Sequence, residues 1–188
     1  MDSYKKYIPE EVSNLPLMLK NSAKLYASRP SLTSVDGTAY TYEELDRATQ
    51  HVAVMLNSAG IGQDNKVAIL AENSPHWGIA YFGTLICGAT TVPILPDFRA
   101  KEVRSILEHS EAKTVFVSGK LISRLNEGLP KSVEMVINTD DFQLLDLDQG
   151  VVAEPSGTPG TLSKLEVESK ISVDDTGYYE ADGEELAS

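Results

Sequence analysis

Few side chains in this sequence have the type and spacing that acid–base, nucleophilic or metal chemistry requires. The three histidines, His51, His76 and His109, fall in three different predicted segments, without the i, i+4 pair or cysteine partner of a metal site. Ser74 lacks the G-x-S-x-G turn of a nucleophilic serine, and a helix-capping role is sufficient for it. Cys87 lies in an apolar helical segment, where burial raises the pKa of a thiol and leaves it inert. We therefore predict no catalytic residue and no metal ligand.

Two further patterns that look like functional sites have simpler structural explanations. Gly60-Ile61-Gly62 precedes a predicted strand, whereas a dinucleotide-binding glycine loop must follow a strand and open a helix. It is better explained as a helix end followed by a turn. The paired acids are neighbours in sequence, so their side chains point apart and do not form an acid–base dyad. These pairs are Glu43-Glu44, Asp174-Asp175 and Glu184-Glu185.

One small basic group remains as a candidate ligand contact. Arg99, Lys101 and Arg104 follow a predicted strand at 91–95, so they lie near the carboxyl end of that strand. Open α/β sheets bind their ligands at the carboxyl ends of the strands, where a cation can contact a phosphate. Cations on the solvated face of a helix give the same pattern, so both interpretations stay open.

The elements that would position these residues alternate between strand and helix. Apolar strand runs at 66–71, 91–95, 114–117 and 133–137 are separated by helix-length segments. This order is typical of a parallel sheet with crossover helices. We therefore predict an α/β fold with an open, mostly parallel sheet and crossover helices on both faces.

An N-terminal helix and a β-hairpin are predicted before this sheet. Ser13 or Asn14 can cap the helix. The strand runs SLTSV and TAYT flank Asp36-Gly37, which predicts a hairpin with a two-residue turn. Thr41 and Glu44 then have the spacing of a capping box at the start of a second helix.

The helix that begins after Ser74 is apolar on nearly every side, from Trp77 to Cys87. A helix without a polar face must be buried on two sides. A two-layer domain of this size leaves little room for that cover, so we expect part of it to come from outside these 188 residues. The chain alone is then expected to expose apolar surface and an unpaired strand edge, and to self-associate.

Charge is distributed unevenly along the chain. The formal net charge is −12, but residues 1–139 carry 15 acids and 14 bases, whereas residues 140–188 carry 13 acids and 2 bases. We predict an α/β subdomain at 1–139 and a linker with an irregular acidic tail at 140–188. The acidic balance argues against nucleic acid as a partner. The single cysteine and the lack of a signal or long apolar span predict a cytoplasmic protein without a transmembrane segment.

Three stretches form a series: SLTSVDGTAYTY, TYEELDRATQHVAVMLNSAGIGQDNKVAILAENSPHW and GTLICGATTVPILPDFRAKEVRSILEHSEAKTVFVS. Together they resemble the opening of the AMP-forming acyl-adenylating enzymes, a family that includes acyl-CoA ligases, luciferases and peptide-synthetase adenylation domains. The resemblance covers residues 12–139. The details TYEEL, ENSPHW and GATTVPILP are most similar to long-chain fatty acyl-CoA ligases.

The resemblance implies a parent enzyme that uses ATP, Mg²⁺ and coenzyme A to convert a fatty acid to its adenylate and then to its thioester. Peripheral contact with a membrane is compatible with that activity. The ATP loop of the family would follow Ser188, so this N-terminal fragment is expected to be inactive and to bind none of these cofactors. Family members can place a basic residue after the proline matching Pro96, near the coenzyme A phosphates. This sequence has Asp97 there, and Arg99 or Lys101 is the expected substitute.

Two alternatives stay open. A free-standing flavodoxin-like interaction module would be a monomer closed by its own helices, with a polar face on the helix after Ser74. An amino-acid-activating domain of the same family would differ only in its substrate, which these residues do not decide.

Overall fold

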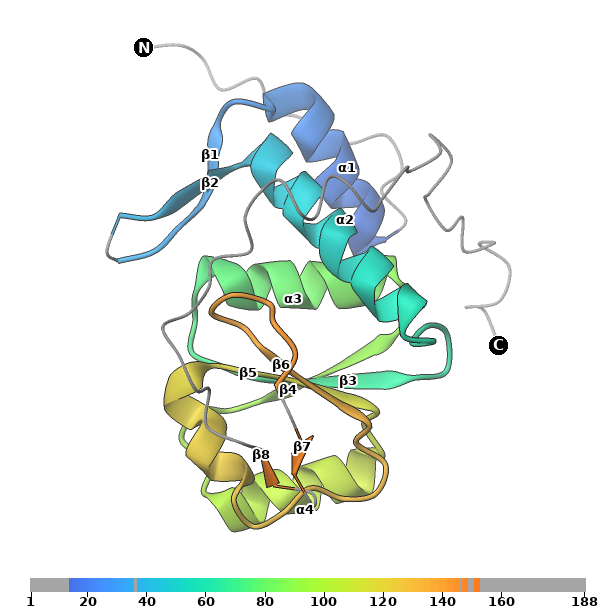
Figure 1. The fold of residues 1–188 in the computed structure, drawn as a ribbon. Coiled ribbons are helices and arrows are strands. Elements are labelled where there is room, and N and C mark those ends of the chain that lie inside the picture. The colour runs from blue at the N-terminus through green and yellow to red at the C-terminus, as the bar shows by residue number, and fades with distance from the viewer. Residues whose placement is uncertain (1–13, 36, 146, 149–150, 153–188) are drawn as a thin grey trace.

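The computed structural model describes residues 14–35, 37–145, 147–148 and 151–152 (Figure 1). Its elements are α1 (Leu15–Tyr26), β1 (Pro30–Thr33), β2 (Ala39–Thr41), α2 (Tyr42–Ser58), β3 (Lys66–Leu70), α3 (Pro75–Ile86), β4 (Thr90–Ile94), α4 (Ala100–Ser110), β5 (Thr114–Val117), the 3-10 helix η1 (Gly119–Leu125), β6 (Met135–Asn138), β7 (Leu147–Asp148) and β8 (Val151–Val152). Most of the predicted acidic tail, from residue 153 onward, lies outside the described residues.

The four strands of the main sheet are parallel and lie in the order β4-β3-β5-β6. Val67 of β3 is paired with Thr91 of β4 on one side and with Thr114 of β5 on the other. β3 is therefore an inner strand, and the side chains from Val67 to Leu70 are fully buried. This explains why the β3 sequence is continuously apolar instead of alternating. The predicted parallel sheet is confirmed.

Helices cover both faces of this sheet (Figure 1). Val67 and Ile69 of β3 point into the core that contains α2 and α3, whereas Ala68 and Leu70 point into the core that contains α4 and η1. The predicted α/β class, with crossover helices on both faces, is confirmed. The helical segment between β5 and β6 is the short 3-10 helix η1.

Helix α3 is covered on both sides, and its second cover comes from this chain. α2 crosses α3 on the side away from the sheet, so closely that a Cβ on Gly83 would lie 2.5 Å from Cγ1 of Val52. α1 and α2 form a third layer, so this chain supplies much of the cover that was expected from outside it (Figure 1). Trp77 and Tyr81 of α3 remain partly exposed, with their rings stacked at 5.2 Å. In the described part of the chain, no helix is both long and apolar enough to cross a bilayer.

The hairpin of β1 and β2 forms, but its turn is longer than predicted. Ser34 N donates to Thr38 O at 2.8 Å, and Gly37 N donates to Ser34 O at 3.1 Å. Ser34, and not Val35, is therefore opposite Thr38, so the two-residue turn was wrong. Gly37 has a φ of 94°, which side chains of L-residues disfavour and glycine permits.

The predicted caps are present at the first two helices. Asn14 accepts a hydrogen bond from Leu17 N at 2.8 Å and so caps α1. At the start of α2, Glu44 N donates to Thr41 Oγ1 at 3.2 Å, and Thr41 N donates to Glu44 Oε2 at 2.9 Å. This reciprocal capping box gives the TYEEL stretch a structural role, because it satisfies two backbone donors that the helix start leaves without partners.

Pairing with a further strand is limited at both edges of the main sheet. β4 forms one edge, where Pro93 cannot donate a ladder hydrogen bond. At the other edge, Leu145 N donates to Val136 O and Asn138 N donates to Gln143 O, each at 2.9 Å. The segment after β6 therefore runs back along that strand, and the expectation of an unpaired edge was wrong for β6.

Replacing Gly83 with alanine tests the close crossing of α2 and α3. Alanine gains about 1 kcal/mol of helix propensity over glycine. The new methyl group would overlap Val52, however, so we expect a net loss of about 1–3 kcal/mol in the free energy of unfolding, measured by urea denaturation. Gly62→Ala is the control, because its Cβ would meet its nearest neighbour, Cys87 O, at 3.7 Å. Unchanged or increased stability in Gly83→Ala would contradict the crossing.

Candidate functional site

The carboxyl ends of the parallel strands meet at one edge of the sheet, called here the carboxyl edge. β3 and β5 are neighbours, but the chain leaves β3 through α3 on one face and leaves β5 through η1 on the other. Open α/β sheets bind ligands at such a point, where the connections diverge. The polar residues that follow β3, β5 and β6 are therefore the candidate site.

A short hydrogen bond joins β3 to β5 at this point. Ser118 Oγ donates to Glu72 Oε2 at 2.6 Å, and Ser118 is buried while Glu72 is partly exposed. The bond from Ser118 is the main cause that lowers the pKa of Glu72; burial opposes the shift, and the charge of Lys120 contributes to it. Glu72 is therefore ionised at neutral pH and acts as a hydrogen-bond acceptor.

The turn after β6 is tied to the same edge. Gly119 N donates to Asp140 Oδ2 at 3.1 Å, and Asp140 N donates to Asn138 Oδ1 at 3.0 Å. A Cβ on Gly119 would lie 2.8 Å from Asp140 Oδ2, so the close approach requires glycine or a shift of that carboxylate. Three of the four strands are thus linked at their carboxyl ends by polar side chains.

These groups can orient a ligand, but they do not form a catalytic set. A carboxylate whose pKa is lowered is a weak base, so Glu72 is poorly suited to activate the Ser118 hydroxyl. Among the described residues, no three His, Cys, Asp or Glu side chains lie together in a way that could hold a metal ion. The described groups at this edge can therefore bind and position a ligand.

The basic group after β4 separates into two parts. Arg104 Nη1 donates to Glu127 O at 2.6 Å and to Gly128 O at 3.1 Å, so this side chain holds the loop after η1. Arg99 precedes α4, with its backbone N donating to Glu102 Oε2 at 2.8 Å, and the side chains of Arg99 and Lys101 are exposed. The contact of these two cations with a phosphate stays a prediction.

The other residues considered from the sequence are placed apart from one another. Ser74 Oγ accepts from Trp77 N at 3.1 Å, which confirms its capping role. Cys87 is buried, and its Sγ donates to Thr84 O at 3.2 Å; burial raises the pKa of this thiol. Gly60, with a φ of 77°, ends α2 ahead of β3. The three histidines do not meet: His51 is in α2, His76 begins α3 and His109 is near the end of α4.

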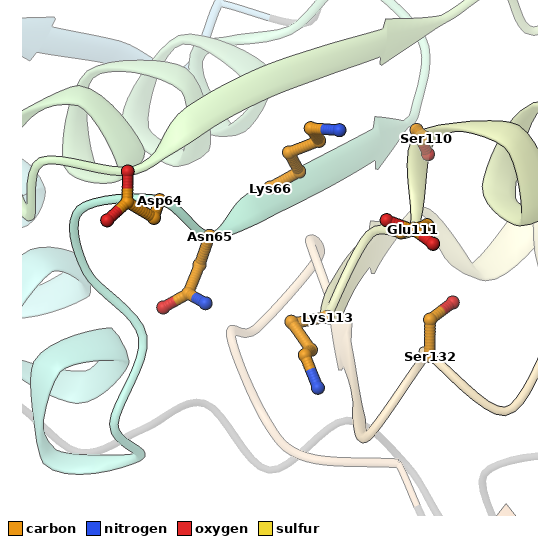
Figure 2. Close-up of a pocket in the computed structure, with 7 residues that line it drawn as sticks. All are labelled: Asp64, Asn65, Lys66, Ser110, Glu111, Lys113 and Ser132. Carbon is orange, nitrogen blue, oxygen red and sulfur yellow. The ribbon is translucent and has the colours of Figure 1, made fainter.

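A polar hollow of about 320 Å³ lies at the opposite edge of the sheet, at the amino ends of β3 and β5 (Figure 2). Asp64, Lys66, Glu111 and Lys113 give it two charges of each sign. Figure 2 shows the side chains of Lys66 and Lys113 extending in different directions, and Lys113 pairs with Glu134. Balanced charges and divergent lysines do not favour an anion here, so the carboxyl edge remains the candidate.

The sequence did not single out Glu72, Ser118 or Asp140. A usable signal exists, because each is a polar residue one or two positions after a buried strand. The signal can be used only when the strand order is known, because that order shows that the ends of β3 and β5 are adjacent.

Comparison with known proteins identifies one family. The family model described as AMP-binding enzyme matches residues 19–178. The long-chain-fatty-acid–CoA ligase heimdall of Drosophila melanogaster is 30% identical over 122 residues, which are 61% of this chain and 18% of that protein. Surfactin synthase subunit 1 of Bacillus subtilis (strain 168) is 26% identical over 155 residues, 76% of this chain and 4% of that protein.

Solved structures agree with these matches. A fatty acyl CoA synthetase of Mycobacterium tuberculosis has 26% sequence identity and a TM-score of 0.61, over 68% of this chain and 26% of that one. The anthranilate CoA ligase AuaEII, in complex with anthranoyl-AMP, has 22% identity and a TM-score of 0.60, over 65% of this chain and 24% of that one, and shows the shared fold alone. The chain thus spans 26% or less of the length of each relative named here.

Replacing Ser118 with alanine tests the bond at the carboxyl edge. We expect the pKa of Glu72 to rise toward its ordinary value, as followed by an NMR titration of its side chain. Because the folded state has the lower pKa, the contribution of Glu72 to stability is present above its unfolded-state pKa and is lost as the pH falls through the folded-state pKa. The wild type should therefore lose more stability on acidification than Ser118→Ala.

Ser123→Ala, at an exposed position of η1, is the matched control and should behave as the wild type does. An unchanged pKa of Glu72 in Ser118→Ala would show that the bond does not control this carboxylate.

Proposed function

This chain belongs to the family of AMP-binding enzymes, and we propose that it forms the N-terminal part of an acid–thiol ligase. The observation that carries the proposal is the family match over residues 19–178, which takes in every strand of the main sheet. In the proposed reaction, a carboxylate displaces pyrophosphate from ATP to form an acyl-adenylate. The thiol sulfur of coenzyme A then attacks the acyl carbon, AMP leaves, and the thiol proton is released.

In this proposal, the described residues contribute a rigid frame. The sheet, covered by helices on both faces, fixes the carboxyl edge, and positioning of this kind can lower a reaction barrier without an acid, base or nucleophile. ATP and Mg²⁺ are cofactors of the proposed parent enzyme. The described residues do not fit a metal, since no suitable ligand group lies among them, and we assign no step through Mg²⁺ to this part of the chain.

We propose a long-chain fatty acid as the substrate of the parent enzyme. Support comes from the Drosophila ligase at 30% identity and from the mycobacterial fatty acyl CoA synthetase, together with the TYEEL, ENSPHW and GATTVPILP stretches. Residues 1–139 then form the α/β subdomain, and residues 140–188 lead on toward the ATP loop. We place this enzyme in the cytoplasm, in peripheral contact with membranes, and we expect the isolated chain to self-associate through the apolar side chains that it exposes.

An amino-acid-activating enzyme is the second candidate, favoured by the match to surfactin synthase subunit 1 over 76% of this chain. It shares the first step and differs in the acid that is activated. A free-standing interaction module is disfavoured, because α3 carries no polar face and the family match takes in the whole sheet.

We expect residues 1–188 alone to release no pyrophosphate from ATP with any acid, because the described part supplies neither a metal group nor a phosphate-binding glycine loop. A coupled pyrophosphate assay measures this, first with fatty acids of graded length and then with amino acids. A longer protein from the same gene, assayed in parallel, is the positive control, and its preferred acid separates the two candidates. Pyrophosphate release by residues 1–188 alone would contradict the proposal that this part of the enzyme supplies a frame without reacting groups.

We also propose that Arg99 and Lys101 contact the phosphates of coenzyme A. Replacing both with alanine in the longer protein should raise the KM for coenzyme A about tenfold, with the rate of acyl-adenylate formation unchanged. Lys131→Ala removes an exposed cation from the loop before β6, at the opposite edge of the sheet, and is the control. An unchanged KM in the double variant, or an equal effect of Lys131→Ala, would count against this contact.

A further inference from the structure

Four rings form a continuous series of contacts beneath the carboxyl edge. Tyr40 of β2 contacts His76 at 6.0 Å between ring centroids, His76 contacts Phe142 at 5.5 Å, and Phe142 contacts Phe116 at 6.1 Å. All three contacts have the edge-to-face geometry that aromatic pairs favour. The series starts in the hairpin, passes the start of α3 and the turn after β6, and ends in the buried strand β5.

The Tyr40–His76 contact also carries a hydrogen bond. Tyr40 Oη lies 2.9 Å from His76 Nε2, and both side chains are partly buried. Burial, and then the negative charge of Glu44, raise the pKa of Tyr40, so its hydroxyl keeps its proton. Either tautomer of His76 can satisfy this bond, because the hydroxyl donates to a bare Nε2 or accepts from a protonated one. The imidazole is thus held on one side by a directional bond.

His76 also contacts a residue with an unusual backbone. Phe142 has a φ of 56°, in the left-handed region that bulky side chains rarely adopt. Such a conformation persists only where its surroundings impose it. The rings of His76 and Phe116 contact the Phe142 ring, and the bond from Asn138 N to Gln143 O closes the turn.

We propose that His76 is a bridging residue that couples the β1–β2 hairpin to the turn after β6. Within the described residues, no hydrogen bond or ring contact joins Tyr40 to Phe142 directly, whereas each of them contacts His76. A change at the turn, which adjoins the Asp140–Gly119 bond of the carboxyl edge, is therefore transmitted to the hairpin through the imidazole. This coupling does not depend on the reaction of the parent enzyme.

Hydrogen exchange on residues 1–188 tests the coupling, because single amides report each element. Ser34 N, which donates to Thr38 O, reports the hairpin, and Leu145 N, which donates to Val136 O, reports the turn. Tyr40→Phe removes only the hydroxyl, and we expect it to speed exchange at Leu145 as well as at Ser34, each about tenfold. Phe142→Leu changes the turn, and we expect it to speed exchange at Ser34 in the hairpin.

In a His76→Ala background, the two cross effects should disappear, so that Tyr40→Phe no longer alters Leu145 and Phe142→Leu no longer alters Ser34. His76→Gln is the second variant, because it can keep a hydrogen bond to Tyr40 while losing the ring contact with Phe142. It should likewise abolish the effect of Phe142→Leu on Ser34.

Two controls separate coupling from general loosening. Tyr42→Phe changes a tyrosine whose ring contacts Tyr26 of α1 and lies outside the series, and it should leave Leu145 unaffected. Amides of β3, which carries none of the four rings, report global opening and should keep their protection in every variant that is compared. The proposal is overturned if Tyr40→Phe and Phe142→Leu each affect only their own element, or if the cross effects persist without His76.

Discussion

The structure depends on the burial of α3 between two layers. This helix has no polar face, so it must have the sheet on one side and other helices on the opposite side. α2 meets that need by approaching within contact of the α3 backbone at Gly83, a distance that no larger residue allows without a shift. The position of α2 then fixes the hairpin, because the capping box at Thr41 starts α2 directly after β2. The N-terminal elements are therefore part of the same packing unit as the parallel sheet.

The same packing brings polar groups together at the carboxyl edge. The last residue of β6, Asn138, and the polar residues that follow β3, β5 and β6 supply the side-chain hydrogen bonds at this edge. The Ser118–Glu72 hydrogen bond connects the ends of β3 and β5, and the Gly119–Asp140 hydrogen bond connects the end of β5 to the turn after β6. The contact of His76 with Phe142 lies next to this turn. A surface held by these bonds is suited to orient a ligand.

This view agrees with the size of the relatives. The chain covers 26% of the mycobacterial fatty acyl CoA synthetase and 18% of the Drosophila ligase, so most of each relative has no counterpart here. The stretches of this chain that resemble the family form helix caps, buried strands and turns. Such features specify a frame, and one frame can carry different functions. This explains why the same chain matches both fatty acid ligases and a surfactin synthase subunit.

The sequence by itself determined the local elements and the fold class. Apolar runs of strand length alternating with helices predicted the parallel sheet, and the Thr41–Glu44 spacing predicted the capping box, because both depend on residues close in sequence. The tertiary structure alone decided the turn register at Ser34, the cover of α3 by α2, and the pairing of Glu72 with Ser118, 46 residues apart. Each of these depends on which surfaces meet across the core. That is set by volume and close approach between distant segments, which no local pattern encodes.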